Sequence, residues 1–184
     1  MEYWDVYDPD REKTGRIIQR GIDSLAEGEY HISVHVVIRN RAGQLLIQRR
    51  SEEKEDWPGV WDVAAAGRAL AGESSSAAAE RELREELGLA LEIAGKAPRM
   101  SIAIDHCFGD WYVVEADPKL SDLRAQSGEV SEVRWASGDE IFAMISDGRL
   151  IDYYPGFIEM LLSGDGHTGA MRSWRGRWKN TSGK

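Results

Sequence analysis

The segment from Gly67 to Leu89 constrains this chain more than any other, because a glycine-bearing loop leads into a strongly acidic helix. Serines before the alanine-rich stretch supply an N-cap and Gly88 supplies a stop, so we predict a helix over Ser74 to Leu87. At about 100° per residue, three of its glutamates fall within an arc of about 100° on one face, namely Glu82, Glu85 and Glu86. Carboxylates crowded in this way repel one another unless water or a cation holds them.

The acidic face predicts a site for a hard divalent cation. Carboxylate oxygens favour Mg²⁺ or Mn²⁺ over softer metals. Gly67 and Gly72 let the preceding loop fold back, so that backbone carbonyls and Glu73 approach the same point. Arg81 can pair with Glu85 one turn later or with Glu73 across the loop, and so orient a carboxylate. The alternative for any helix with three glutamates is a solvated charged face.

The charge distribution agrees with cation binding rather than nucleic-acid binding. The 184 residues include 23 basic and 32 acidic side chains, a net charge of −9. Five of the basic residues and none of the acidic ones fall within residues 166–184, so residues 1–165 carry a net charge of −14. So acidic a domain is a poor candidate for binding the phosphate backbone of a nucleic acid. The basic tail, with Trp174 and Trp178, is a candidate for contacting RNA, an anionic surface or a partner subunit, and the alternative is a solvated C-terminal extension.

Length and composition predict one domain with enough apolar residues for a proper core, since 42% of the residues are hydrophobic. We expect this domain over residues 1–165, opening with a hairpin and lead-in over 1–29, and a basic tail over 166–184. The sequence shows neither an apolar run of about 18 residues nor a secretory signal, which predicts a cytoplasmic protein that does not enter the membrane. The single cysteine, Cys107, excludes an internal disulfide and a cysteine-based zinc site.

Hydrophobic periodicity predicts an α/β (α+β) fold in which helices flank a mixed sheet. The expected strands are residues 3–7, 16–20, 31–39, 44–49, a short strand ending at 64–66, 89–94, 99–106, 110–116 and 130–135. Two further helices are expected over 140–145 and 154–162. We place a turn around Gly109, which explains the polar residues near it as an alternative to contact with substrate.

The spacing within the acidic segment resembles the Nudix box at every defining position. The pattern is Gly67, five residues, Glu73, seven residues, Arg81-Glu82-Leu83, one residue, Glu85-Glu86, one residue and Gly88-Leu89. This resemblance implies a Nudix-type α/β/α sandwich with a mixed β-sheet, in which the box forms a loop–helix–loop. It also implies a MutT-like hydrolase that uses Mg²⁺ or Mn²⁺ to cleave a pyrophosphate bond in a nucleotide, in a nucleoside diphosphate linked to another moiety, or in a related organic pyrophosphate.

The resemblance also implies roles for individual residues. Glu82, Glu85 and Glu86 are the expected metal ligands or the base beside them, Gly67 the expected carbonyl ligand, and Arg81 the residue that orients the glutamates. The general base varies in this family. Glu82 is the candidate within the box, and the candidates outside it are Glu129 and Glu132.

A second stretch, from Gly43 to Trp61, is similar to isopentenyl-diphosphate isomerases, which share the Nudix fold. This similarity implies that Arg50 and Lys54 bind the substrate diphosphate, one as a planar fork and the other as a point charge. Isomerases place a cysteine before the box glycine and a histidine after it, where this chain has Ala66 and Arg68. An isomerase-like enzyme is therefore the disfavoured alternative. A non-catalytic Nudix-like binding or regulatory domain is the other, although such domains typically lose the glutamates that this chain keeps.

Aromatic residues outside the box leave two questions open. Trp57 and Trp61 could stack on a nucleobase, but packing is the commoner role for a tryptophan in such a turn. The N-terminal hairpin carries aromatic residues that a two-stranded unit cannot bury alone. We expect it to pack on the domain or on a second subunit, so a homodimer is compatible with the sequence.

Overall fold

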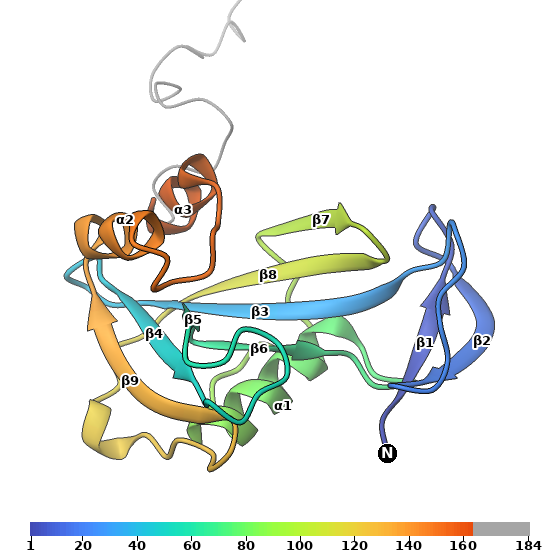
Figure 1. The fold of residues 1–184 in the computed structure, drawn as a ribbon, viewed down its shortest axis with the longest axis horizontal. Coiled ribbons are helices and arrows are strands. Elements are labelled where there is room, and N and C mark those ends of the chain that lie inside the picture. The colour runs from blue at the N-terminus through green and yellow to red at the C-terminus, as the bar shows by residue number, and fades with distance from the viewer. Residues whose placement is uncertain (164–184) are drawn as a thin grey trace, which may run out of the picture.

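Residues 1–163 are described by a computed structural model, and the expected basic tail lies outside them. They form nine strands, three α-helices and one 3₁₀ turn (Figure 1). In chain order these are β1 (Tyr3–Tyr7), β2 (Lys13–Gln19), β3 (His31–Arg39), β4 (Leu45–Arg50), β5 (Trp61–Val63), β6 (Ala65–Arg68), α1 (Ser75–Leu87), β7 (Met100–Ile104), β8 (Cys107–Glu115), η1 (Leu120–Asp122), β9 (Val130–Ala136), α2 (Gly138–Ser146) and α3 (Pro155–Leu162).

Strands β3 to β9 form one mixed sheet. β3 and β8 run parallel along their whole length, from His31 opposite Cys107 to Arg39 opposite Glu115. β3 and β4 are antiparallel and pair only beside the turn that joins them, at Ile38 with Leu46 and at Arg39 with Leu45. Beyond those pairs the two strands diverge. β5 then pairs with β4 and β6 pairs with β3, so the segment entering the acidic helix lies between the two diverging strands.

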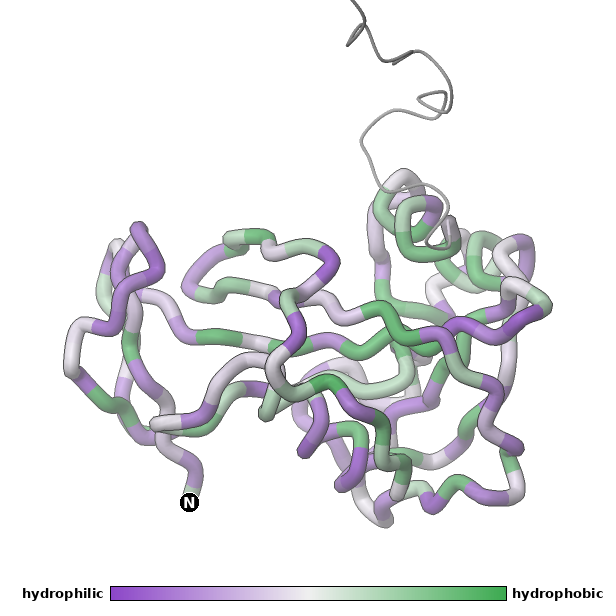
Figure 2. The backbone as a smooth tube through the Cα atoms, turned by 180° about the vertical axis from the view of Figure 1, so that it is seen from behind, coloured by the Kyte–Doolittle hydropathy of each residue, from purple (hydrophilic) through white to green (hydrophobic). Residues whose placement is uncertain are grey.

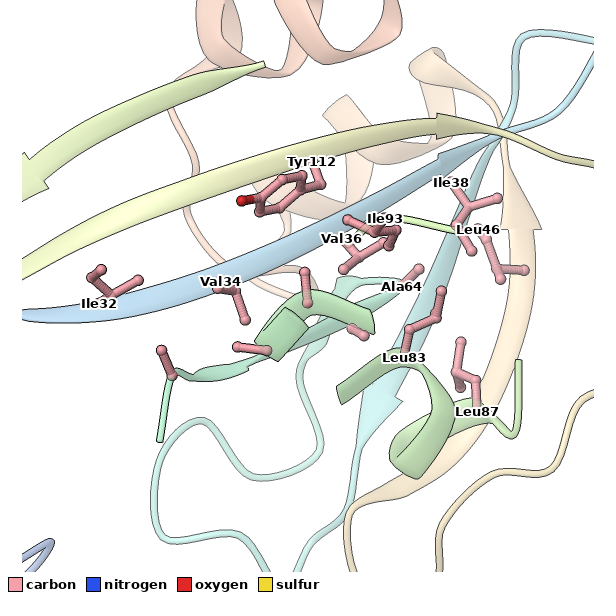
Figure 3. Packing of buried hydrophobic residues seen from close by; sticks show 14 of the residues in the cluster. Ile32, Val34, Val36, Ile38, Leu46, Ala64, Leu83, Leu87, Ile93 and Tyr112 are labelled. Carbon is pink, nitrogen blue, oxygen red and sulfur yellow. The ribbon is translucent and has the colours of Figure 1, made fainter. Parts of the chain in front are cut away.

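The two faces of this sheet carry separate cores. On one face, Val34 and Val36 of β3 pack with Leu83 and Leu87 of α1 (Figure 3). The opposite face packs against α2 and α3, with buried contributors Val37, Leu45, Ile47, Val63, Ile141, Met144, Ile158 and Leu161. Figure 1 shows α1 on one side of the strands and α2 and α3 on the other, which confirms the predicted α/β/α sandwich. Hydrophobic residues follow the central strands and the C-terminal helices in Figure 2.

The ends of α1 match the sequence prediction. The Ser74 side chain accepts a hydrogen bond from the Ala77 N–H, and Gly88 closes the helix in the left-handed conformation at φ 65°. No helix within residues 1–163 has the length and apolarity required to cross a bilayer.

Two sequence predictions about local structure are wrong. Residues 89–94 form no strand, because Ile93 is buried against α1 and the Ile93 and Ala94 N–H groups donate to the Glu80 carboxylate at 3.4 and 3.0 Å. The turn between β7 and β8 is at Asp105 and His106, where Asp105 has φ 49°, and Gly109 lies inside β8.

The N-terminal hairpin packs on the domain, as expected. The Ala71 N–H donates to the Tyr3 carbonyl and the Gly72 N–H donates to the Asp5 carboxylate, both at 2.7 Å. Arg11 in the hairpin turn forms an ion pair with the fully buried Asp110 of β8. These contacts attach the hairpin to the loop that leads into α1 and to β8.

Candidate active site

Gly67 in β6 lies directly against the carboxylate of Glu82. A Cβ atom at position 67 would lie 2.1 Å from Glu82 Cδ, far inside van der Waals contact. The next backbone N–H, that of Arg68, donates to Glu82 Oε1 at 3.3 Å. The predicted close approach of this loop to the acidic helix face is therefore present, and it leaves no space for a side chain at Gly67.

Arg81 connects the acidic side chains to one another. Its guanidinium donates to both Glu73 oxygens at 3.0 Å, to Glu82 Oε1 at 2.9 Å and to Glu85 Oε2 at 3.0 Å. It also donates to the Arg68 carbonyl at 2.9 Å. Burial alone would lower the pKa of Arg81, but the bonds and charges of Glu73 and Glu82 outweigh it and raise that pKa. Both partners expected for Arg81 are thus engaged at once.

Glu86 is the most buried of the three helix glutamates, with 6% of its surface exposed. Its Oε2 accepts a hydrogen bond from Gln48 Nε2 at 2.7 Å and another from the Ala66 N–H at 3.4 Å. Burial raises the pKa of Glu86 to about 8, against the opposing hydrogen bond from Gln48 and with added repulsion from Glu82 and Asp62. Glu86 therefore lies where a negative charge is costly without a cation.

Gln48 and Asp62 complete this buried cluster, and the sequence reasoning missed both. They face each other across β4 and β5. Asp62 is 2% exposed and its Oδ1 accepts hydrogen bonds from the Val63 N–H at 2.7 Å and from the Tyr153 hydroxyl at 2.6 Å. Burial raises the pKa of Asp62, although the Tyr153 bond opposes the shift. The sequence did contain one indication of Asp62, because an aspartate between the apolar residues Trp61 and Val63 of a buried strand is unusual.

Tyr153→Phe should lower the free energy of unfolding by about 1–3 kcal/mol, because the buried Asp62 carboxylate loses a hydrogen-bond donor. The pKa of Asp62 would then rise further. When a carboxyl has a raised pKa in the folded state, the free energy of unfolding of the protein falls as pH rises. The loss should therefore be larger at pH 8 than at pH 5 in urea denaturation. Tyr154→Phe is the matched control, since Tyr154 is 86% exposed. Equal effects of the two substitutions would contradict this assignment.

Arg50 and Lys54 lie at the start of the loop between β4 and β5. Arg50 donates to the Asp56 carbonyl from Nε at 3.0 Å and from Nη2 at 2.7 Å, and Lys54 forms an ion pair with Glu129. Neither contacts the helix glutamates directly. The positive charge of Arg50 lowers the pKa of Asp62, and the charge of Asp62 raises the pKa of Glu86, although burial is the larger cause for both carboxyls.

The two candidate bases outside the box lie in different places. The segment that carries Glu129 reaches the end of α1, where the Gln126 N–H donates to the backbone carbonyl of Glu86 at 2.8 Å, and Glu129 itself forms an ion pair with Lys54. Glu132 pairs with Arg49 across β9 and β4, and both line a hollow of about 330 Å³ with Trp61. Since Gln48, adjacent to Arg49, faces Glu86, Glu132 lies on the opposite face of the sheet.

The donor set at the cluster fits a divalent cation. Within residues 1–163 no three carboxylate, imidazole or thiol groups converge closely enough to hold a metal as they stand, and Arg81 donates to both Glu82 and Glu85. The side-chain amide oxygen of Gln48, Oε1, is nevertheless buried and has no hydrogen-bond partner among the described residues. An unpaired acceptor beside a buried carboxylate is an arrangement that a hard cation would satisfy.

The two loop tryptophans have different environments. Trp61 is 9% exposed in the core beneath α2 and α3, with the Arg134 guanidinium 5.2 Å from its ring centroid. Packing is therefore its role. Trp57 is 55% exposed at φ 52°, so contact with a substrate ring stays a prediction for this residue alone.

Comparison with known proteins agrees with this geometry. The NUDIX domain family matches residues 29–154. An uncharacterized Nudix hydrolase of Listeria monocytogenes is 44% identical over 154 residues, which cover 84% of this chain and 90% of that protein. Nudix hydrolase 3 of Arabidopsis thaliana is 45% identical over 153 residues, covering 76% of this chain and 20% of the plant protein.

Solved structures show the same fold. A Deinococcus radiodurans protein superposes with a TM-score of 0.70 at 25% identity, covering 87% of this chain and 97% of the other. The MutT protein of Methanosarcina mazei superposes with a TM-score of 0.59 at 26% identity, covering 72% and 92%. The matched family, the relatives and the complete box together show that this chain belongs to the Nudix family and is a Nudix pyrophosphohydrolase.

Proposed function

We propose that this enzyme uses Mg²⁺ or Mn²⁺ to hydrolyse the pyrophosphate bond of a small nucleoside diphosphate linked to another moiety. The observation that carries the proposal is the arrangement around Gly67, where Arg81 orients Glu82 and Glu85 while Glu86 lies buried beside them. The proposed ligands are the carboxylates of Glu82, Glu85 and Glu86 and the carbonyl of Gly67. When bound, a divalent cation neutralises phosphate oxygens and activates water for attack on phosphorus.

The loop cations are the proposed diphosphate ligands. Arg50 is already oriented by two hydrogen bonds to the Asp56 carbonyl, which reduces the side-chain entropy that substrate binding would cost. Lys54 holds Glu129 in an ion pair. A diphosphate that draws Lys54 toward it would free the Glu129 carboxylate to accept a proton from water. Glu129 is therefore the proposed base, ahead of Glu82, which Arg81 engages, and of Glu132 on the other sheet face.

The isomerase alternative gains no support. The relatives reported above carry the name Nudix hydrolase. The residue before Gly67 is Ala66, and the chain's cysteine, Cys107, contacts the Ser33 hydroxyl at 3.0 Å on a strand apart from the helix glutamates. A non-catalytic role gains none either, because the box glutamates are all retained.

Arg50→Ala should raise the Michaelis constant about tenfold and change kcat by less than about threefold, because a diphosphate ligand binds ground state and transition state alike. Steady-state kinetics on the best substrate measure both constants. Arg41→Ala is the control, since the Arg41 side chain is 95% exposed and pairs with Asp117 away from the site. An unchanged Michaelis constant would remove Arg50 from the diphosphate site.

The substrate class is testable with a panel. Nucleoside diphosphates and triphosphates, nucleotide sugars, dinucleotides and isopentenyl diphosphate would be incubated with Mg²⁺, Mn²⁺ or EDTA, and the phosphorus-containing products separated. We expect metal-dependent cleavage of at least one nucleoside diphosphate derivative. Isomerised prenyl diphosphate without hydrolysis would contradict the proposal, as would cleavage undiminished by EDTA.

A further inference from the structure

A second polar cluster lies on the sheet face opposite α1, and the catalytic proposal does not use it. Because side chains alternate along β3, His31, Ser33 and His35 point away from α1, whereas Ile32, Val34 and Val36 pack against it. Arg68 of β6 lies directly opposite Ser33. In Figure 1 this part of β3 runs between the N-terminal hairpin at one end and α2 and α3 at the other.

Arg68 is a cation without an ion-pair partner among the described residues. Among residues 1–163 its guanidinium forms neither an ion pair nor a hydrogen bond, and it lies 5.0 Å from the ring centroid of Trp4. The Trp4 ring also contacts the His31 ring at 4.8 Å. Burial lowers the pKa of Arg68. Its Nε is buried without a hydrogen-bond partner, and a buried donor of this kind is costly unless a ligand or water accepts from it.

The surrounding groups lack partners as well. Seven buried side-chain atoms of the described residues have no hydrogen-bond partner, and four of them belong to this cluster: Trp4 Nε1, His31 Nδ1, His35 Nδ1 and Arg68 Nε. Burial, with the charge of Arg68, lowers the pKa of both histidines to about 4, so both rings are neutral at pH 7. A bound water would satisfy a donor, but it would supply no negative charge to the Arg68 guanidinium.

Arg68 also connects the cluster to the catalytic loop. Its N–H donates to Glu82 and its carbonyl accepts from Arg81, so the backbone belongs to one site and the side chain to the other. Asp56, whose carbonyl orients Arg50, is among the charges that act on Arg68. A substrate held at Glu82 therefore lies next to residue 68, whose side chain belongs to the second cluster.

We propose that Arg68 binds an oxyanion, either a carboxylate or a phosphate, on the part of the substrate beyond the scissile diphosphate. The inference rests on the proposed function for its substrate and deepens it by naming a chemical feature of that substrate. Guanidinium matches oxyanion geometry with paired N–H donors. The Trp4 indole N–H and the neutral histidines supply further donors at the edge of the cluster. The substrate class is thus an organic pyrophosphate with a second, separate anionic group.

The first test measures the binding of inorganic sulfate in the absence of divalent metal. The NMR signal of the Trp4 indole N–H is the readout of binding. Trp4→Phe assigns that signal among the seven tryptophans. We expect a saturable shift in the unmodified protein, an affinity lowered at least about tenfold in Arg68→Gln and a smaller loss in Arg68→Lys. Arg41→Gln is the control and should match the unmodified protein. A Trp4 shift that survives in folded Arg68→Gln, or sulfate binding that leaves Trp4 unshifted, would overturn the proposal.

The second test separates a substrate subsite from a site for a free anion. Sulfate should inhibit hydrolysis competitively, and Arg68→Gln should raise its inhibition constant about tenfold. Sulfate that binds at Arg68 without raising the Michaelis constant would overturn the assignment to substrate. Absence of any hydrolysis would contradict the proposed function alone, because the Trp4 signal requires no turnover and would still decide whether Arg68 binds an anion.

Discussion

Glu86→Gln should lower kcat roughly 10²- to 10³-fold while the protein stays folded, the size typical when a group that stabilises transition-state charge is removed. Glutamine keeps the shape of the side chain and can still pair with Gln48, but it removes the charge that a divalent cation needs. Steady-state kinetics with saturating Mn²⁺ measure the loss. Glu92→Gln is the control, since Glu92 is exposed outside the box.

The same substitution should stabilise the metal-free protein at alkaline pH. The pKa of Glu86 is raised from 4.5 to about 8 in the folded state, so the folded protein binds the extra proton between these values. This group therefore contributes stability that is present below about pH 4.5 and is lost as pH rises through about 8, at no more than about 1.4 kcal/mol per pH unit.

Urea denaturation in EDTA at pH 5 and pH 8.5 would measure this effect. We expect Glu86→Gln to lose less stability between the two values than the unmodified protein. Glu92→Gln should follow the unmodified protein. If the stability of Glu86→Gln and of the unmodified protein depended on pH in the same way, ionisation of the buried Glu86 would not destabilise the metal-free protein.

Gly67→Ala should be the most damaging single-methyl change in the site. The added Cβ would lie 2.1 Å from Glu82 Cδ, so either the carboxylate or β6 must move. A displacement of about 1 Å in a catalytic group costs on the order of 10²-fold in rate, and we expect kcat/KM to fall by at least that factor. Because Glu82 also pairs with Arg81, the orientation of Glu73 and Glu85 would be disturbed as well.

Gly156→Ala provides the matched control for that methyl group. A Cβ at position 156 meets no atom within 4 Å, and the residue lies in α3, where alanine is favoured over glycine by about 0.5–1 kcal/mol. We expect unchanged activity and equal or higher stability. Activity of Gly67→Ala within twofold of the unmodified enzyme would show that the close approach of Gly67 to Glu82 does not matter for catalysis.

Local signals predicted the acidic helix and its loop well. Ser74, Gly88 and the box spacing are contained within 23 consecutive residues, and the caps and contacts they imply are short-range. Residues 89–94 show where local signals fail. An apolar run of that length suits a strand, but tertiary packing of Ile93 against α1 determined its conformation.

The buried half of the site depends on contacts between distant residues. Gln48 and Glu86 are 38 positions apart, and Asp62 and Tyr153 are 91 apart. No periodicity links such pairs, so they appear only once β4 and β5 lie beside α1. The same holds for Glu129 and Glu132, whose different locations follow from strand register rather than from spacing along the chain.

We propose that one carboxylate cluster both binds the cation and supports hydrolysis. Titration of Mn²⁺ followed by electron paramagnetic resonance, in parallel with pyrophosphate-bond cleavage, tests it most directly in the unmodified enzyme and Glu86→Gln. We predict that cleavage rises with the fraction of bound Mn²⁺, and that Glu86→Gln weakens Mn²⁺ binding and abolishes most cleavage together. Full cleavage in EDTA, or Mn²⁺ binding and turnover in Glu86→Gln equal to those of the unmodified enzyme, would contradict this double role of the carboxylate cluster.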